Sequence, residues 1–140
     1  MASQSLIVHA TCVAVAGKGV LITGPSGSGK SGLALQLIAF GGQLVADDRT
    51  VLQVRAGHLI ASAPPAIEGM IEARGLGILP LAHLRDVQLA CCIDMSREEM
   101  ARLPEPQSTT LLDIVLPTFK KVNAPHFPAA VHAYLMGKPI

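Results

Sequence analysis

The sequence predicts an α/β fold with a mixed sheet, and three observations carry this prediction. Short runs rich in β-branched residues alternate with turn signals, which is typical of strands. Residues 31–40 place apolar side chains at helical spacing. Neighbouring strands joined by tight turns indicate hairpins, so we expect a sheet that is not purely parallel.

The elements follow in order along the chain. We expect strands at residues 6–8, 11–15, 20–23, 43–46, 50–54, 58–62, 87–93 and 111–116, with tight turns at 16–19 and 55–57. Gly41 and Gly42 follow the helix expected at 31–40, and glycine commonly ends a helix. Residues 128–136 predict a second short helix with proline at its start. A chain of 140 residues closes one core, so we expect a single domain over residues 1–140.

Composition excludes several classes of partner. A formal net charge of +1 and 15% charged residues provide no polybasic face, so we do not expect nucleic acid as a partner. No apolar run reaches the roughly 18 residues of a membrane span. Cys12, Cys91 and Cys92 have no metal-ligand spacing and are interpreted as buried thiols of a reduced cytoplasm. We therefore expect a cytoplasmic protein without a membrane segment.

The strongest motif is a glycine-rich phosphate loop between a predicted strand and a predicted helix. It fits the pattern G-x-x-x-x-G-K-[ST] in full, as Gly24, Pro25, Ser26, Gly27, Ser28, Gly29, Lys30 and Ser31. Backbone N–H groups of such a loop face an anion, and the helix N-terminus adds partial positive charge. Lys30 is expected to reach the phosphates and Ser31 to bind Mg²⁺. The motif predicts binding of a nucleotide such as ATP, with phosphoryl transfer as the chemistry.

Two segments compete to supply the carboxylate that works with this loop. Spacing alone favours Asp94, at the end of the strand expected at 87–93. Asp47 and Asp48 are adjacent acids, whose mutual repulsion a cation or a transferred proton would offset. We favour this pair, with one member as general base on an attacking hydroxyl. A solvated turn or a helix cap remains the alternative.

A second glycine-containing segment, residues 72–78, places a carboxylate and a guanidinium beside two glycines. It fits a mobile loop over phosphates, in which Arg74 neutralises charge on the transferring group and Glu72 completes the magnesium shell. An ordinary loop with a surface ion pair explains the same residues. His9 follows a short apolar run and, taken alone, reads more simply as a strand residue than as a catalyst.

Together, these segments resemble the catalytic domain of the bacterial HPr kinase/phosphorylase. The resemblance rests on Val8-His9, the phosphate loop, residues 44–48 (Leu-Val-Ala-Asp-Asp) and residues 72–78 (Glu-Ala-Arg-Gly-Leu-Gly-Ile), and it runs from about residue 6 to about residue 94. It implies a fold similar to the phosphoenolpyruvate carboxykinase core and an ATP- and Mg²⁺-dependent kinase that phosphorylates a serine of HPr or a nitrogen-branch relative. Family members also run the reverse, phosphorolytic step and assemble into hexamers, so we expect a homo-oligomer.

The resemblance also implies roles for individual residues. Asp48 takes the proton from the acceptor with Asp47 beside it, and His9 lies near the active centre. Lys30 is the loop lysine, Ser31 and Glu72 are the magnesium ligands, and Arg74 serves catalysis in both directions.

The chain departs from the family pattern in three places. Gly32 stands where the family usually has glutamate, residues 116–123 are only a loose counterpart of an arginine-containing loop, and the chain resembles the short form without a separate N-terminal domain. Two other functions stay open: a nucleotide-sensing module without catalysis, and a small-molecule kinase.

Overall fold

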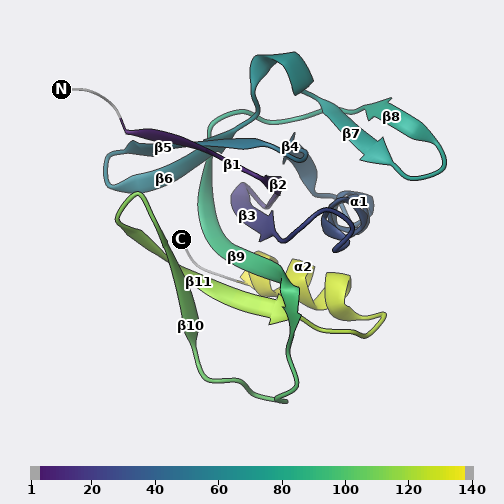
Figure 1. Ribbon diagram of the computed structural model, residues 1–140, viewed down its shortest axis with the longest axis vertical. Helices are drawn as coiled ribbons and strands as arrows, with labels where there is room; N and C mark the ends of the chain where they lie inside the picture. Colours follow the sequence, from purple (N-terminus) through teal and green to yellow (C-terminus); the bar gives the residue numbers. More distant parts are fainter. Residues whose placement is uncertain (1–3, 138–140) are drawn as a thin grey trace.

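The computed structural model describes residues 4–137, which form one nine-stranded sheet, two α-helices and a separate two-stranded hairpin (Figure 1). The strands of the main sheet are β1 (Ser5–Val8), β2 (Ala10–Val15), β3 (Lys18–Thr23), β4 (Gln43–Ala46), β5 (Thr50–Arg55), β6 (His58–Ser62), β9 (Val87–Glu98), β10 (Gln107–Leu111) and β11 (Ile114–Lys121). The helices are α1 (Lys30–Ala39) and α2 (Phe127–Gly137), and a 3₁₀ turn, η1 (Pro65–Ile67), precedes the hairpin of β7 (Met70–Ala73) and β8 (Gly77–Pro80).

β9 joins the two parts of the main sheet. The strand order is β1-β5-β6-β9-β3-β2-β4, and β11 with its partner β10 branches from β9. β9 pairs in parallel with β3 and β11, but antiparallel with β6. The α/β class and the mixed sheet are therefore confirmed.

β2 shows how the sheet buries both of its faces. All six of its residues are buried. Val13 and Val15 point into the core that α1 and α2 cover, whereas Cys12 and Ala14 point into a second core on the other face. Burial on both faces explains why the strand reads as a continuous apolar run instead of an alternating one.

Most predicted elements are found within a few residues of their expected bounds. The hairpins β2–β3 and β5–β6 form as expected, as do both helices. All three cysteines are buried, as predicted. Neither helix in the described part of the chain is long and apolar enough to cross a bilayer.

The strand predicted at residues 111–116 is wrong. The chain reverses there: Leu112 and Asp113 both take positive φ, 49° and 64°, and connect β10 to β11 as a tight hairpin. Two positive φ angles are typical of the two-residue turns that match strand twist. Glycine or asparagine usually signals such a turn, and this segment contains neither.

Residues 72–78, predicted as a loop, belong mostly to a hairpin. In the pairing of β7 with β8, Met70 lies opposite Pro80 and Ala73 lies opposite Gly77. Only residues 74–76 form the connecting turn. Figure 1 shows this hairpin extending beside α1, away from the main sheet. The hairpin places residues from its first strand and its tip next to the phosphate loop.

Candidate phosphate-binding and catalytic site

The phosphate loop connects β3 to α1, as its sequence predicts. Gly24 has φ 139° and Gly29 has φ 98°, a region that L-residues with side chains rarely adopt. A Cβ added at Gly24 would lie 2.6 Å from Ser28 Oγ, so this position also lacks room for a side chain. The Ser28 N–H donates to the Pro25 carbonyl at 3.1 Å, which curls the loop.

Lys30 is folded back over this loop. The side chain is only 7% exposed. Its Nζ donates to the carbonyls of Gly24 at 2.7 Å and Pro25 at 3.1 Å. The ammonium group is thus held where phosphate oxygens would meet it, at the mouth of a loop that carries backbone N–H donors.

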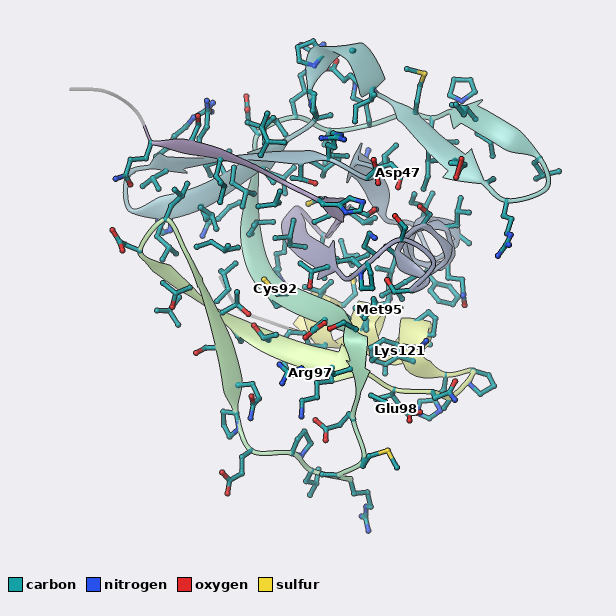
Figure 2. The ribbon with its side chains drawn as sticks, in the orientation of Figure 1. Asp47, Cys92, Met95, Arg97, Glu98 and Lys121 are labelled. Carbon is teal, nitrogen blue, oxygen red and sulfur yellow. The ribbon has the colours of Figure 1, made fainter. Side chains whose placement is uncertain are left out.

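Asp47 is the centre of a buried hydrogen-bond network. It is 8% exposed at the end of β4. Its Oδ1 accepts from Ser31 Oγ at 2.8 Å and from Thr11 Oγ1 at 3.0 Å, and its Oδ2 accepts from the Glu72 N–H at 3.0 Å. Figure 2 shows Asp47 between the end of β4, α1 and the β7–β8 hairpin. One carboxylate therefore ties the phosphate loop, β2 and the hairpin together.

Asp48 has a different environment, although it is the next residue. Its φ is 68°, which turns its side chain away from the buried network, and the side chain is 59% exposed. Asp48 Oδ1 lies 2.7 Å from His9 Nε2, and Arg49 Nε is 4.0 Å from Oδ2. An accessible carboxylate held by an imidazole is suited to receive a proton from an incoming group.

The predicted site residues lie around one cavity of about 730 Å³. Asp48, Glu72 and Arg74 line it together with Lys30, Ser31 and the middle of the phosphate loop. His9 and Asp47 do not line the cavity themselves. His9 contacts Asp48, and Asp47 accepts a hydrogen bond from Ser31. The structure thus brings together residues from four segments that are far apart in the chain.

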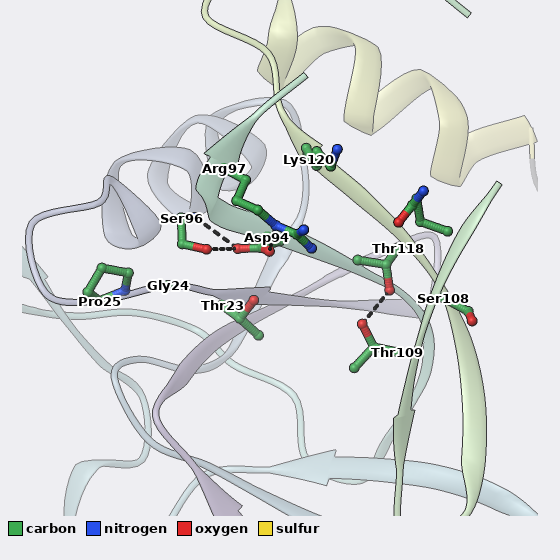
Figure 3. A pocket seen from close by; sticks show the side chains of 11 residues that line it. Thr23, Gly24, Pro25, Asp94, Ser96, Arg97, Ser108, Thr109, Thr118 and Lys120 are labelled. Atoms are coloured by element: carbon green, nitrogen blue, oxygen red, sulfur yellow. Dashed lines mark hydrogen bonds and ion pairs between the residues drawn. The ribbon is translucent and has the colours of Figure 1, made fainter. Parts of the chain in front are cut away.

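Asp94 lies in a different pocket, on the side of Gly24 and Pro25 (Figure 3). It accepts hydrogen bonds from the Ser96 N–H at 2.9 Å and Arg97 Nε at 3.3 Å. Partial burial raises the pKa of Asp94, but the hydrogen bonds from Ser96 and Arg97 outweigh burial and hold the pKa below its usual range. The carboxylate that contacts Ser31 is that of Asp47, so the position favoured by generic spacing is not the one beside the loop serine.

Thr11 is a site residue that the sequence analysis missed. Its side chain is fully buried, and its Oγ1 donates to Asp47 while accepting from the Asp48 N–H at 3.2 Å. This hydroxyl therefore fixes the positions of both aspartates. The sequence shows only a threonine near the start of an otherwise apolar strand. Threonine is common in strands because its side chain is β-branched, so its presence there does not indicate a functional role.

Oxygen groups near the loop fit a magnesium ion. The Ser31 hydroxyl donates its hydrogen to Asp47, which leaves its lone pairs available, and Glu72 lines the same cavity. Magnesium binds few protein ligands and retains several waters. The assignment of Ser31 and Glu72 as magnesium ligands therefore stays a prediction.

Comparison with known proteins agrees with this geometry. A family model described as the HPr serine kinase C-terminal domain matches residues 1–91. The HPr kinase/phosphorylase of Clostridium tetani is 49% identical over 77 residues, covering 55% of this chain and 25% of the relative. That of Geobacillus thermodenitrificans is 42% identical over 123 residues, covering 79% of this chain and 40% of the relative. The chain thus spans from a quarter to two fifths of the length of these relatives.

A solved structure extends the similarity to nearly the whole fold. The Hpr(Ser) kinase/phosphatase from Coxiella burnetii superposes with a TM-score of 0.78 at 27% identity, over 94% of this chain and 93% of the other. The family model covers well over half of the sequence and includes the phosphate loop, both adjacent aspartates and the β7–β8 hairpin. The chain therefore belongs to the HPr serine kinase C-terminal domain family.

Proposed function

We propose that residues 1–140 form one catalytic domain of an ATP- and magnesium-dependent protein-serine kinase whose acceptor is HPr or a nitrogen-branch relative. Family membership supports nucleotide use and a serine acceptor. The observation that carries the proposal is the shared cavity, which the exposed residue Asp48 lines together with Lys30 and Ser31. The mixed sheet and the loop between β3 and α1 support a P-loop-containing core of the phosphoenolpyruvate carboxykinase type.

In this reaction Asp48 acts as the general base. Its Oδ takes the proton of the acceptor serine while the serine oxygen forms a bond to the γ-phosphorus, and the bond from that phosphorus to the β–γ bridging oxygen breaks to release ADP. His9 holds one oxygen of Asp48 at 2.7 Å and so orients the other toward the acceptor. A base near an exposed cavity suits an acceptor presented by another protein.

The remaining residues stabilise charge. Lys30 and the loop N–H groups balance the phosphate oxygens, and Arg74, at the tip of the β7–β8 hairpin, balances the charge on the transferring group. Ser31 and Glu72 would hold Mg²⁺, which neutralises phosphate charge when bound. Asp47 keeps Ser31 and the Glu72 backbone in place through its hydrogen bonds.

The proposal includes the reverse, phosphorolytic direction. There the same Asp48 carboxylate takes a proton from inorganic phosphate, whose oxygen forms a bond to the phosphorus of the phosphoserine. The bond from that phosphorus to the serine oxygen breaks, Asp48 returns the proton to the serine oxygen, and serine and pyrophosphate are released. The serine oxygen and the phosphate oxygen lie roughly in line on opposite sides of the same phosphorus, and Asp48 serves both directions by moving one proton between them.

We also propose that the protein assembles into a homo-oligomer, with the family's hexamer as the expected state. Leu76 and Ile78 at the hairpin are 80% and 66% exposed, which leaves apolar surface beside the site. Light scattering on the purified chain measures this directly, and a monomer at micromolar concentration would contradict it.

The test of the kinase is incubation with labelled ATP, Mg²⁺ and HPr, followed by mapping of the labelled residue. We expect label on one serine, loss of transfer in Asp48→Asn with nucleotide binding retained, and transfer retained in the matched variant Asp94→Asn. Activity in Asp48→Asn and none in Asp94→Asn would overturn the assignment. Turnover with a metabolite but not with HPr would indicate a small-molecule kinase, and an intact biological output in Asp48→Asn would indicate a nucleotide sensor.

A further inference from the structure

A second cleft adjoins the phosphate cavity. It has a volume of about 440 Å³ and lies between the first turns of α1 and the segment that joins β11 to α2. Gly29 and Gly32 line both spaces. A Cβ added at Gly32 would meet nothing within 4 Å, so the surface between the two spaces is open. We call this second space the α1–β11 cleft.

The position of the reacting groups decides which way a nucleotide extends. Asp48 and Arg74 border the phosphate cavity, so the terminal phosphoryl group reacts there and the nucleoside must leave in another direction. Within residues 4–137 the polar pocket around Asp94 shares no lining residue with the phosphate cavity. The α1–β11 cleft shares Gly29 and Gly32 with the phosphate cavity, and neither residue carries a side chain.

The walls of the α1–β11 cleft suit a nucleoside. Met95, Val122 and Phe127 give it an apolar side, and the exposed amides of Gln36 and Asn123 supply both donors and acceptors. An apolar wall with a few placed polar groups is typical of small-ligand sites, whose volumes start at about 300 Å³. Ser28 also lines the cleft, and its buried Oγ has no hydrogen-bond partner among the described residues.

We infer that the α1–β11 cleft binds the nucleoside half of the nucleoside triphosphate. The base lies against the apolar side, and Gln36 and Asn123 contact its polar edge. The inference rests on the proposed function, because the direction of the phosphate chain follows from where transfer takes place. It also gives Gly32 a role: a side chain there would stand at the passage between the two spaces.

The first experiment compares ATP with tripolyphosphate, which lacks the nucleoside, by calorimetric titration in the presence of Mg²⁺. We expect the wild-type chain to bind ATP about tenfold more tightly, which corresponds to one or two good polar contacts. Asn123→Ala should weaken ATP binding about fivefold and leave tripolyphosphate binding unchanged. Gln43→Ala removes an exposed amide that lines neither space and should change neither affinity.

The second experiment uses the absence of tryptophan from the sequence. Gln36→Trp introduces a single fluorophore in the cleft, and Ala39→Trp introduces one on the same helix at an exposed position that lines neither space. ATP should change the emission of the first variant only, and tripolyphosphate should change neither.

Three outcomes contradict the inference: equal wild-type affinities for ATP and tripolyphosphate, an equal loss of both in Asn123→Ala, or an ATP response shared by the two tryptophan variants. Failure of the proposed function has a different signature, because incubation with labelled ATP, Mg²⁺ and HPr would then give no labelled serine while the wild-type chain still bound ATP more tightly than tripolyphosphate.

Discussion

Replacing Asp47 by asparagine should lower the stability of the fold, whereas the same replacement at Asp48 should lower the rate of phosphoryl transfer. Asp47 is 8% exposed and accepts three hydrogen bonds, from Thr11, Ser31 and the Glu72 N–H. In Asp47→Asn the backbone N–H cannot rotate, so the amide oxygen must remain on that side and the amide nitrogen must face the two hydroxyls. The hydroxyls can turn to accept, but three bonds to a charged group become neutral ones.

The magnitude follows from those three bonds. A hydrogen bond to a charged group contributes about 1.5–3 kcal/mol and a neutral one about 1 kcal/mol, so losing roughly 1 kcal/mol per bond lowers the free energy of unfolding by about 2–3 kcal/mol. Asp48 is 59% exposed, and its only side-chain hydrogen bond within residues 4–137 joins it to His9. Asp48→Asn should therefore change the free energy of unfolding by less than about 0.5 kcal/mol.

Urea denaturation and the HPr phosphorylation assay, run on both variants, separate the two roles. Asp48→Asn should unfold like the wild type and lose roughly 10²- to 10⁴-fold in transfer rate. Asp47→Asn should unfold at clearly lower urea. If Asp48→Asn were the less stable variant, or if Asp47→Asn unfolded like the wild type, the division between a supporting and a reacting carboxylate would be refuted.

Three further predictions concern other parts of the molecule. Lys30→Ala should weaken tripolyphosphate binding strongly in calorimetric titrations, and unchanged binding would remove the central claim about the loop. Hydrogen bonds from Arg85 and His83 lower the pKa of Glu68, so their stabilisation is present above the ordinary carboxyl pKa of about 4.3 and is lost as pH falls through the lowered value. Melting temperatures measured from pH 7 to pH 3 should show Glu68→Gln less stable than wild type at neutral pH and the two converging in acid, whereas a constant gap would argue against this ion pair. Burial raises the pKa of the Cys92 thiol to about 11, so native protein at pH 8 should react slowly with a thiol reagent and rapidly in urea; fast native labelling would contradict the buried assignment.

The phosphate loop and the hairpins beside it could be predicted from sequence because their signals are local. The loop motif, the glycines at its bends and the helical spacing after it all lie within residues 20–42. The β2–β3 and β5–β6 turns carry glycine, which marks the change of direction. The β10–β11 turn at Leu112 and Asp113 contains no glycine, and the prediction of one strand over residues 111–116 is wrong.

The division of labour between the adjacent aspartates could not be predicted because it depends on distant contacts. Asp47 is held by a backbone N–H that lies 25 residues further along the chain. Asp48 is turned outward by its positive φ and meets His9, which lies 39 residues earlier. A sequence shows two neighbouring carboxylates, but which one is buried follows only from how the β7–β8 hairpin and His9, between β1 and β2, come to lie at the end of β4.

β9 has a consequence for how this protein reaches its folded state. Without β9, the strands β1, β5 and β6 have no connection through the sheet to β3, β2 and β4. β3, which leads into the phosphate loop, gains its parallel partner only when β9 arrives, and Thr23 Oγ1 meets the Ile93 carbonyl across 70 residues of chain. Closing so long a loop costs entropy before any contact repays it, so docking of β9 is expected to be a slow, late step. The ability to hold phosphate should therefore emerge in a refolding experiment together with the completed sheet, and not with the earlier hairpins.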